Sequence, residues 1–396
     1  MKEYHIEDFP KDKIRILLSE NYRTEFWKSL KLIIGSDEKI SKLVNYPHSV
    51  ITKMRLGKNS RGTTYFLPLW MIFKFSKILT ENDYKKFSIR NIEKHIIAFK
   101  TSSTSNIIKN PTLPLLEDER LVRVFMHLIG DGFGGRIYNR PDGTKFYIVP
   151  TYTNTNKKLI EEFVSDLRAF GNVPYHKRHG YTIRRKYWKI LIPMAIKYIF
   201  EQIYNVELSA SRGRLPKRFL KMSNKLKYQV IRAFCDDEGT IQDNGIVVSS
   251  SNKQQLEDLK ILMLKAGFKE KFITDIKFGI RNTYNLKFYG DNFIFYGKFI
   301  GSRHSEKQDT LNFQINRHLK PRKITKEGET KGKLIKLLKS NSLTSLEIAK
   351  KLGISQTWTG AYLRELIRGG EAVKFYRGGK NKITYSYHNI KAVPPA

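Results

Sequence analysis

The alternation of apolar and polar positions divides the chain into parts of different character. Residues 1–100 carry short amphipathic helical patterns, whereas residues 101–115, "TSSTSNIIKNPTLPL", have the Ser, Thr, Asn and Pro content of a linker. Residues 116–321 mix helical periods with runs of strand period. A basic, glycine-containing linker at 322–332 leads to short helices and strands at 333–390. The pattern therefore predicts a helical part, a long α/β part and a small C-terminal part.

The central part repeats one pattern. In each half an apolar helical run ends in an acid and a glycine, "VFMHLIGDG" at 124–132 and "IRAFCDDEG" at 231–239. Strand-like pieces follow, then a helix that stops at a glycine, further strands and a last helix. We predict a duplicated αββαββα unit of α/β (α+β) fold class, with repeats at 116–215 and 216–321.

Negative charge gathers at the end of the second apolar run. Asp236, Asp237 and Glu238 occupy the last helical turn, where the helix dipole disfavours acids. An acid before a glycine is a common turn dipeptide, so neither Asp131 nor Glu238 by itself indicates more than a turn. Their equivalent places in a duplicated unit favour a functional site.

A basic segment, "PHSVITKMRLGKNSRG", lies in the N-terminal part. Lys53, Arg55, Lys58 and Arg61 are spaced so that several can face one partner. This spacing suits the recognition helix of a helix-turn-helix-like domain, followed by a loop that contacts phosphate. A basic, solvated helix surface is the alternative interpretation.

The C-terminal part has the layout of a winged helix. A first helix and a second one, capped by Thr344 or Ser345 with Glu347 nearby, precede a third helix, "TWTGAYLRELIRGG". Two strands with a "YRGGKNK" wing complete it, and in nucleic-acid binders the wing grips phosphates. A winged helix that binds protein is the alternative. The predicted phosphate contacts of the wing are Arg377, Lys380 and Lys382.

Composition narrows the choice of partner. The chain has 396 residues, and 73 Lys and Arg against 37 Asp and Glu give a formal charge of +36. This excess predicts a polyanionic partner, and we expect nucleic acid rather than an anionic membrane surface. Hydrophobic residues make up 40% of the chain, enough for a core rather than a disordered basic tail.

The sequence also bears on location. It has no apolar run of transmembrane length and no signal-peptide layout, and Cys235 is its single cysteine. We therefore expect a cytoplasmic protein without internal disulfides or a membrane partner, associated with the nucleoid when it binds DNA. The Lys-, Ile- and Tyr-rich composition would suit a thermophile.

The duplicated pattern resembles the LAGLIDADG homing endonucleases. Residues 231–239 fit the nine-residue signature of that family. The Leu-Pro and the helix before them, and the helices after them, fit the segments that flank the signature in that family. The first signature is at 124–132, and the resemblance spans residues 116–313. It implies a monomer with pseudo-twofold symmetry, in which the two motif helices pack side by side. Two β-saddles would then lie over the major groove of DNA.

The resemblance also implies a chemistry. The last acid of each motif, Asp131 and Glu238, would face DNA and bind Mg²⁺, with Mn²⁺ as a possible substitute. Carboxylates brought together at negative helix ends are costly unless a cation neutralises them, and Mg²⁺ accepts such oxygens together with those of phosphate. Gly130 and Asp237 join these acids as candidate metal ligands. Of the three clustered acids, Glu238 is the one that matches Asp131, which gives one acid for each DNA strand.

Basic residues near the acids would steady the phosphate, as the family resemblance implies. By position these are Lys307, Arg212 and Arg214, although each could be a plain phosphate contact or a solvated side chain. DNA-reading side chains are expected at every second position of the saddle strands. The candidates are Arg136, Tyr138, Arg140, Tyr152, Lys177, Arg184, Lys186, Gln242, Lys277, Arg281 and Lys287.

Two positions depart from the family pattern. Met126 stands where a small residue usually allows close helix contact, whereas the second motif has the small Ala233. His127 stands where an aliphatic residue is usual. We expect His127 to be a hydrogen-bonded core residue, with a place near the active site as the alternative.

The leading functional hypothesis is a sequence-specific double-strand DNA endonuclease, a monomeric hydrolase flanked by DNA-binding modules. A non-cleaving transcription regulator on the same fold is the first alternative. An RNA-binding maturase is another, because a basic saddle can bind structured RNA, and a nuclease for branched or host DNA is also open. Asp131 and Glu238 favour the enzyme, since a pure binder gains nothing from acids that face phosphate.

Overall fold

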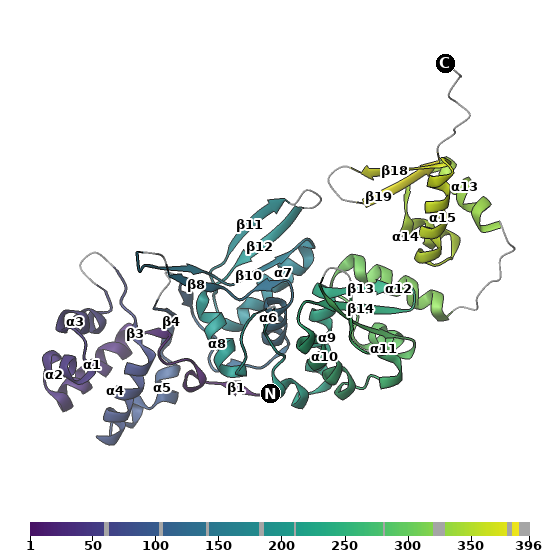
Figure 1. Ribbon diagram of the computed structural model, residues 1–396. Helices are drawn as coiled ribbons and strands as arrows, with labels where there is room; N and C mark the ends of the chain where they lie inside the picture. The colour runs from purple at the N-terminus through teal and green to yellow at the C-terminus, as the bar shows by residue number, and fades with distance from the viewer. Residues whose placement is uncertain are drawn as a thin grey trace, which may run out of the picture. The chain divides into compact units, whose positions relative to one another are not determined.

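The computed structural model describes most of the chain (Figure 1). The described residues are 1–58, 63–102, 106–139, 142–181, 186–209, 211–279, 282–319, 329–377 and 382–387. Several predicted DNA contacts lie outside them, namely Arg61, Arg140, Arg184, Arg281 and Lys380, and so do the side chains of Arg377 and Lys382. The chain divides into two compact units, residues 1–178 with 188–233 and residues 179–187 with 234–396.

The first unit begins with helices packed against a small antiparallel sheet. The helices are α1 (Glu20–Ile34), α2 (Asp37–Val44), α3 (His48–Leu56), α4 (Leu69–Glu81) and α5 (Ile89–Glu93). The sheet has the order β3-β2-β4-β5, with strands Leu67–Pro68, Ile14–Leu18, Ile96–Thr101 and Ile108–Lys109. Buried rings of Phe26 and Trp27 on α1 contact Phe75 on α4, with centroids 6.3 and 5.6 Å away. Aromatic packing therefore holds α1 against α4.

The end of α3 is fixed by a buried cation. Arg23 on α1 donates to the carbonyl oxygens of Arg55 and Leu56, both at 3.3 Å. Gly57 follows with φ +76°, and a Cβ there would lie 2.3 Å from Cζ of Arg23. A side chain at residue 57 would therefore displace the guanidinium that satisfies the last carbonyls of the helix.

Two short strands lie within the described part of the predicted linker, residues 106–115, and at its end. Strand β5 pairs with β4, and β6 (Leu115–Leu116) pairs with β1 (Glu3–Tyr4). Ile108 and Leu115 are fully buried, at 0% and 1% exposure. Single apolar side chains thus anchor two short strands inside a stretch that is otherwise polar.

Two α/β arrangements follow along the chain. The first comprises α6 (Glu119–Ile129), β7 (Gly132–Phe133), β10 (Thr151–Asn154), α7 (Lys157–Asp166), β11 (His176–Tyr181), β12 (Lys186–Leu191) and α8 (Met194–Tyr204). The second comprises α9 (Asn224–Glu238), β13 (Gly239–Gln242), β14 (Gly245–Ser250), α10 (Lys253–Lys265), β15 (Lys277–Phe278), β16 (Tyr284–Tyr289) and α11 (Asp291–Phe299). Their sheets run β11-β12-β10-β7 and β15-β16-β14-β13, so strands of the same rank occupy the same places.

The two arrangements differ in their first hairpin. Between β7 and β10 the first one inserts a separate antiparallel pair, β8 (Arg136–Asn139) with β9 (Lys145–Ile148). Gly134 lies so close to the backbone that a Cβ would be 1.6 Å from the carbonyl oxygen of Leu208, and Gly135 has φ +77°. Because neither glycine has a side chain, the backbone can turn away from the sheet at Gly134 and Gly135. In the second arrangement β13 and β14 are joined directly by Asp243 and Asn244.

The last part of the second unit begins with α12 (Ser305–Leu319). A C-terminal module, residues 329–387, then comprises α13 (Glu329–Ser340), β17 (Leu343–Thr344), α14 (Ser345–Leu352), α15 (Gln356–Arg368), β18 (Ala372–Arg377) and β19 (Lys382–Tyr387). Its sheet has the order β17-β19-β18. Its core comprises Leu334, Leu338, Ile348, Leu363, Leu366 and Ala372.

The predicted cap of α14 is present. The Thr344 hydroxyl accepts a hydrogen bond from the Glu347 backbone N–H at 3.2 Å, and the Thr344 backbone N–H donates to Glu347 Oε2 at 2.8 Å. This reciprocal pair satisfies two backbone donors at the start of the helix.

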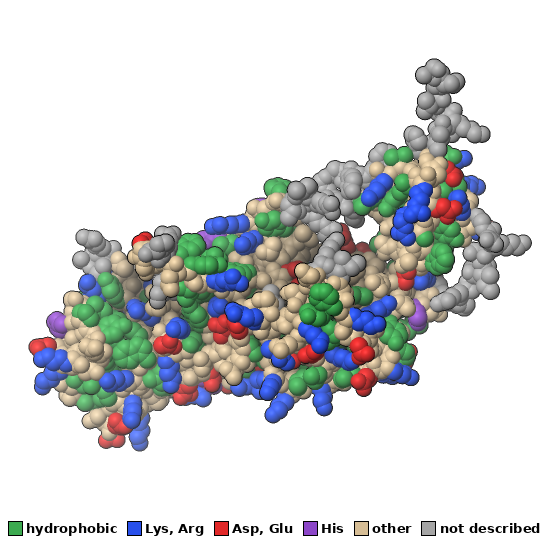
Figure 2. Space-filling model, viewed as in Figure 1, with side chains coloured by type: hydrophobic (Ala, Val, Ile, Leu, Met, Phe, Trp, Pro, Cys, Tyr) green, Lys and Arg blue, Asp and Glu red, His purple; other side chains and the backbone are tan. Residues whose placement is uncertain are grey.

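Lys and Arg side chains are spread over all parts of the face shown in Figure 2. None of the helices in the described ranges combines the length and the apolar character that a membrane crossing needs.

Candidate active site

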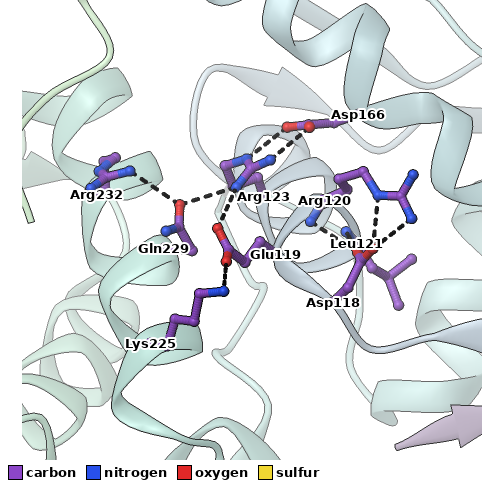
Figure 3. Close-up of polar contacts among 9 residues, drawn as sticks. All are labelled: Asp118, Glu119, Arg120, Leu121, Arg123, Asp166, Lys225, Gln229 and Arg232. Atoms are coloured by element: carbon purple, nitrogen blue, oxygen red, sulfur yellow. Dashed lines mark hydrogen bonds and ion pairs between the residues drawn. The ribbon is translucent and has the colours of Figure 1, made fainter. Parts of the chain in front are cut away.

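A polar network, buried around Arg123 and exposed at Lys225, joins α6 to the first half of α9 within the first unit (Figure 3). Arg123 on α6 donates to both carboxylate oxygens of Asp166, each at 2.7 Å, and to Oε1 of Gln229 on α9 at 3.1 Å. Lys225 on α9 pairs with Glu119 on α6 at 2.6 Å. Burial disfavours the charge of Arg123, but its hydrogen bonds to Asp166 hold the pKa of the guanidinium above its ordinary value. The two motif helices are therefore linked by charge-assisted hydrogen bonds.

The residues that depart from the family pattern lie in the core. Met126 and Ala233 are buried, at 0% and 1% exposure. His127 is 2% exposed, and its ring centroid lies 4.8 Å from that of Tyr152 and 6.1 Å from that of Phe163. The structure thus places His127 among core aromatic rings. Tyr152, expected to read DNA, is wholly buried in the same cluster, and that expectation is wrong.

Asp131 follows the end of α6 and is held by the neighbouring strand. Gly130 caps the helix, its backbone N–H donating to the carbonyl of Met126 at 2.9 Å. Asn154 at the end of β10 donates from Nδ2 to Oδ2 of Asp131 at 2.8 Å. This bond orients the Asp131 carboxylate, which remains partly exposed. Asn154 was not identified from the sequence, where a strand-end Asn indicates only a turn or helix cap.

Both motif glycines allow a close approach between strand and helix. A Cβ on Gly132 would lie 2.4 Å from the carbonyl oxygen of Leu128, and one on Gly239 would lie 2.4 Å from that of Cys235. Each glycine thus meets the backbone of the residue four positions earlier, at the end of its helix. The acid-glycine pair recurs because the strand must leave the helix end at this close distance.

Glu238 is the last residue of α9 and is only partly exposed. Burial raises the pKa of its carboxyl to about 7, helped by the negative charge of Asp237 and opposed by Lys307. At neutral pH this carboxyl is therefore poised between its protonated and ionised forms. A bound cation would favour the ionised form.

Asp236 has a structural partner instead. It is 2% exposed, accepts a hydrogen bond from the Ser302 hydroxyl, and accepts another from the backbone N–H of Arg303 at 3.1 Å. The Lys307 ammonium donates to the carbonyl oxygens of Asp236 and Cys235 at 2.6 and 3.0 Å. Lys307 thus supplies the positive charge that the negative end of α9 favours, next to Glu238. The three acids consequently have different environments.

The other residues predicted to contact phosphate are exposed or partly exposed. Arg212 pairs with Glu207 at 2.7 Å on the surface, and Arg214 is exposed in the same loop. On the saddle strands the exposed candidates are Arg136, Tyr138, Lys177, Lys186, Gln242 and Lys277, while Lys287 is partly exposed and donates to Asn244 at 3.2 Å.

The basic residues of α3 are less uniform than their spacing suggests. Arg55 donates to Oδ2 of Asp37 at 3.2 Å, and the Lys53 ammonium lies 5.7 Å from the Tyr65 ring centroid. Lys58, just after the helix, is exposed. Arg55 therefore ties α3 to α2 in addition to any role in binding.

Replacement of Glu238 by Gln is expected to stabilise the fold at neutral and alkaline pH. Because the pKa near 7 lies above the usual 4.5, the folded protein holds a proton that the unfolded chain releases, and stability falls between these pH values. The gain from Gln should be about 2–3 kcal/mol above pH 7 and vanish below about pH 4.5.

Urea unfolding at acidic and alkaline pH, without divalent ions, measures this difference. Glu257→Gln is the control, because the Glu257 side chain is 44% exposed and pairs with Lys253 four residues away. A stabilisation by Glu238→Gln that does not change with pH would contradict the raised pKa.

No protein-family model and no curated protein matches this chain. Among solved structures, the homing endonuclease I-DmoI in complex with DNA and Mn is 16% identical over 46% of this chain and 96% of its own, with a TM-score of 0.36. The homing endonuclease I-WcaI bound to its DNA recognition sequence is 14% identical over 48% of this chain and 86% of its own, with a TM-score of 0.32. Full-length DUF199/WhiA from Thermatoga maritima is 12% identical over 65% of this chain and 93% of its own, with a TM-score of 0.33.

Proposed function

We propose that the chain is a sequence-specific, metal-dependent double-strand DNA endonuclease of the LAGLIDADG type. The observation that carries this proposal is the recurrence of one local geometry at two helix ends. Asp131 and Glu238 each stand before a glycine packed against helix backbone, and each helix leads into a sheet of the same strand order. Together with the two signature motifs, this supports a duplicated unit at 116–321 with one catalytic acid in each repeat.

The donor atoms at these helix ends suit Mg²⁺, or Mn²⁺ in its place. Asp131 and the Gly130 carbonyl at one helix end, and Glu238 at the other, are oxygen donors, which hard divalent cations prefer. Asp237, beside Glu238, is an auxiliary candidate that this proposal does not require. Burial and the charge of Asp237 raise the pKa of Glu238, a penalty that a bound cation would offset. Within the described part of the chain, no three His, Cys, Asp or Glu residues could hold a metal together, so phosphate oxygens complete the ligand set in this proposal.

Bound metal would supply an activated water and stabilise the departing 3′ oxygen. The residues of the chain then have separate tasks. Asn154 aims the Asp131 carboxylate, and Lys307 sets the end of α9 and adds positive charge beside Glu238. Arg212 and Arg214 serve as phosphate contacts. Each acid acts on one DNA strand, and the chain works as a monomer in the cytoplasm.

In this proposal two further modules also bind DNA. Residues 1–100 form a helix-turn-helix-like domain that uses α3. Residues 333–390 form a winged helix, supported by the order of α13, β17, α14, α15, β18 and β19. Such modules also suit a non-cleaving regulator, which is the second candidate function.

Binding to duplex DNA is expected to weaken steeply with salt. A chain of formal charge +36 that neutralises many phosphates releases their counterions. With 6–10 phosphate contacts the affinity should fall on the order of 10³-fold or more between about 50 and 200 mM salt. Fluorescence anisotropy on a labelled duplex measures the slope, and a DNA library incubated with Mg²⁺ identifies the cleavage site.

Two outcomes would decide against the endonuclease. Salt-insensitive binding, or a preference for anionic lipid vesicles over duplex DNA, would refute a DNA partner. Tight binding to one sequence without a nick in Mg²⁺ or Mn²⁺ would favour the regulator.

A further inference from the structure

The hairpin of β13 and β14 carries an acid at its tip. Gln242 pairs with Gly245, so Asp243 and Asn244 are the two turn residues. A carboxylate at the tip of a saddle hairpin would repel DNA phosphate unless another group neutralised it. The surroundings of Asp243 within the second unit show which groups do so.

Asp243 accepts hydrogen bonds from two elements. On α12, Nε2 of Gln314 donates at 3.2 Å and Nη1 of Arg317 at 3.4 Å. On α15 of the C-terminal module, the backbone N–H of Gln356 donates at 3.2 Å. One carboxylate thus bridges the second repeat and the C-terminal module.

The electrostatics agree with this geometry. Burial would raise the pKa of Asp243, but hydrogen bonds from Thr357 and Ser355 and the charge of Arg317 hold that pKa below its ordinary value. The carboxylate is therefore ionised at neutral pH. An anion beside the first turn of a helix also meets the positive end of its dipole.

The rest of this contact is polar and open. A cleft of about 510 Å³ between the hairpin tip and α15 is lined by Gln242, Asn244, Lys287 and Thr357, with Ile241 as its apolar member. Most of the residues that line this cleft are polar, and the hydrogen bonds of Asp243 are the direct contacts between the hairpin tip and α15 there.

The position of Asp243 bears on DNA binding. A recognition helix presents its N-terminal residues to DNA, and phosphate oxygens commonly accept hydrogen bonds from the first backbone N–H groups of helices. The N–H of Gln356 is one of these groups on α15, and Asp243 already occupies it. Trp358, two residues later, is 63% exposed.

We propose that the tip of the β13–β14 hairpin is a docking surface for the chain's own winged helix, on which Asp243 takes the place of a DNA phosphate at the start of α15. Duplex DNA then competes with Asp243 for the start of α15, and the winged helix moves from the hairpin to the DNA phosphates. This inference rests on the proposed DNA-binding function, whereas the docking itself is independent of DNA.

Asp243→Asn in the full chain tests both parts. Without DNA, amide hydrogen exchange in peptides covering 356–359 should become about tenfold faster, since a hydrogen bond to a charged acceptor is lost. Affinity for a short duplex should rise by about tenfold as the competitor is weakened. Asn is a favoured turn residue, so the hairpin keeps its shape.

Asp275→Asn is the matched control. It removes the same charge from the same repeat, at a side chain that is 92% exposed and pairs with Lys260 at 3.4 Å. It should leave exchange at 356–359 unchanged and raise affinity by at most about twofold.

The outcomes separate docking from function. Unchanged exchange at 356–359 in Asp243→Asn would overturn the docking surface. Faster exchange with no more affinity than Asp275→Asn would overturn the competition with DNA. Arg317→Met, which removes the other charged partner, should also speed exchange at 356–359. No DNA binding by any of these proteins would instead refute the proposed function, and exchange alone would then decide the docking.

Discussion

Asp131→Asn and Glu238→Gln are each expected to abolish DNA cleavage while binding is retained or slightly tightened. Each change deletes a charge that would hold the metal, and loss even of groups that only support metal ligands costs about 10–100-fold. Losing the ligand itself should therefore cost on the order of 100-fold or more. Binding survives because the substituted side chains no longer repel phosphate. A gel shift paired with a cleavage assay on the site found in the library measures both effects.

Asp237→Asn is the matched control for Glu238→Gln. Asp237 is a neighbouring, partly exposed acid whose charge raises the pKa of Glu238, so its removal should keep cleavage and extend it to lower pH. Asp236→Asn is less informative, because Asp236 is buried against Ser302 and Arg303 and its loss would disturb the end of α9. If Asp237 proved essential and Glu238 dispensable, the register of the second motif would be off by one residue.

Local patterns predicted local structure well. Helices α7 and α10 follow their apolar periodicity. A 3-10 helix, Leu167–Phe170, continues α7 to Gly171, and α10 ends two residues before Gly267; these glycines have φ of +105° and +102°. The Thr344 cap with Glu347 was also visible in the sequence. These features depend on residues a few positions apart, which a sequence displays directly.

Features that depend on distant partners could not be predicted. Asp236 differs from Glu238 because Ser302 and Arg303 meet it from a loop 66 and 67 residues later. Alternation along the strand predicts Tyr152 on the DNA face, but its ring is buried against His127 of α6 and Phe163 of α7. Which face of a strand is buried is set by the helix that packs on it, and alternation alone leaves that choice open.

Composition did not reveal the short strands at Ile108–Lys109 and Leu115–Leu116, for a related reason. Most side chains of residues 101–115 are polar, yet Ile108 and Leu115 are buried in short strands. Strand pairing satisfies the backbone whatever the side chains are, so one apolar residue per strand suffices for attachment. The separate pair of β8 and β9 could not be predicted either. The backbone leaves the sheet at Gly134, where it lies in close contact with the distant residue Leu208.

Arg123→Met is expected to lower the free energy of unfolding by about 3–5 kcal/mol. Asp166 is 5% exposed and would lose both of its 2.7 Å hydrogen bonds, which leaves a buried charge without a partner. Gln229 on α9 would lose its bond from α6 as well. Urea denaturation followed by circular dichroism measures the change.

Arg120→Met is the control for this prediction. Arg120 lies on the same helix and pairs with Asp118 at 2.7 Å, but its side chain is 43% exposed, so the loss should be at most about 1 kcal/mol. The double variant Arg123→Met with Asp166→Leu removes both charges and should recover much of the stability, because no buried charge is then left unpaired. If Arg123→Met cost no more than Arg120→Met, the network in Figure 3 would not be what joins α6 to α9. A large loss with recovery in the double variant would show that the pair between Arg123 and Asp166 fixes the helix whose end carries Asp131.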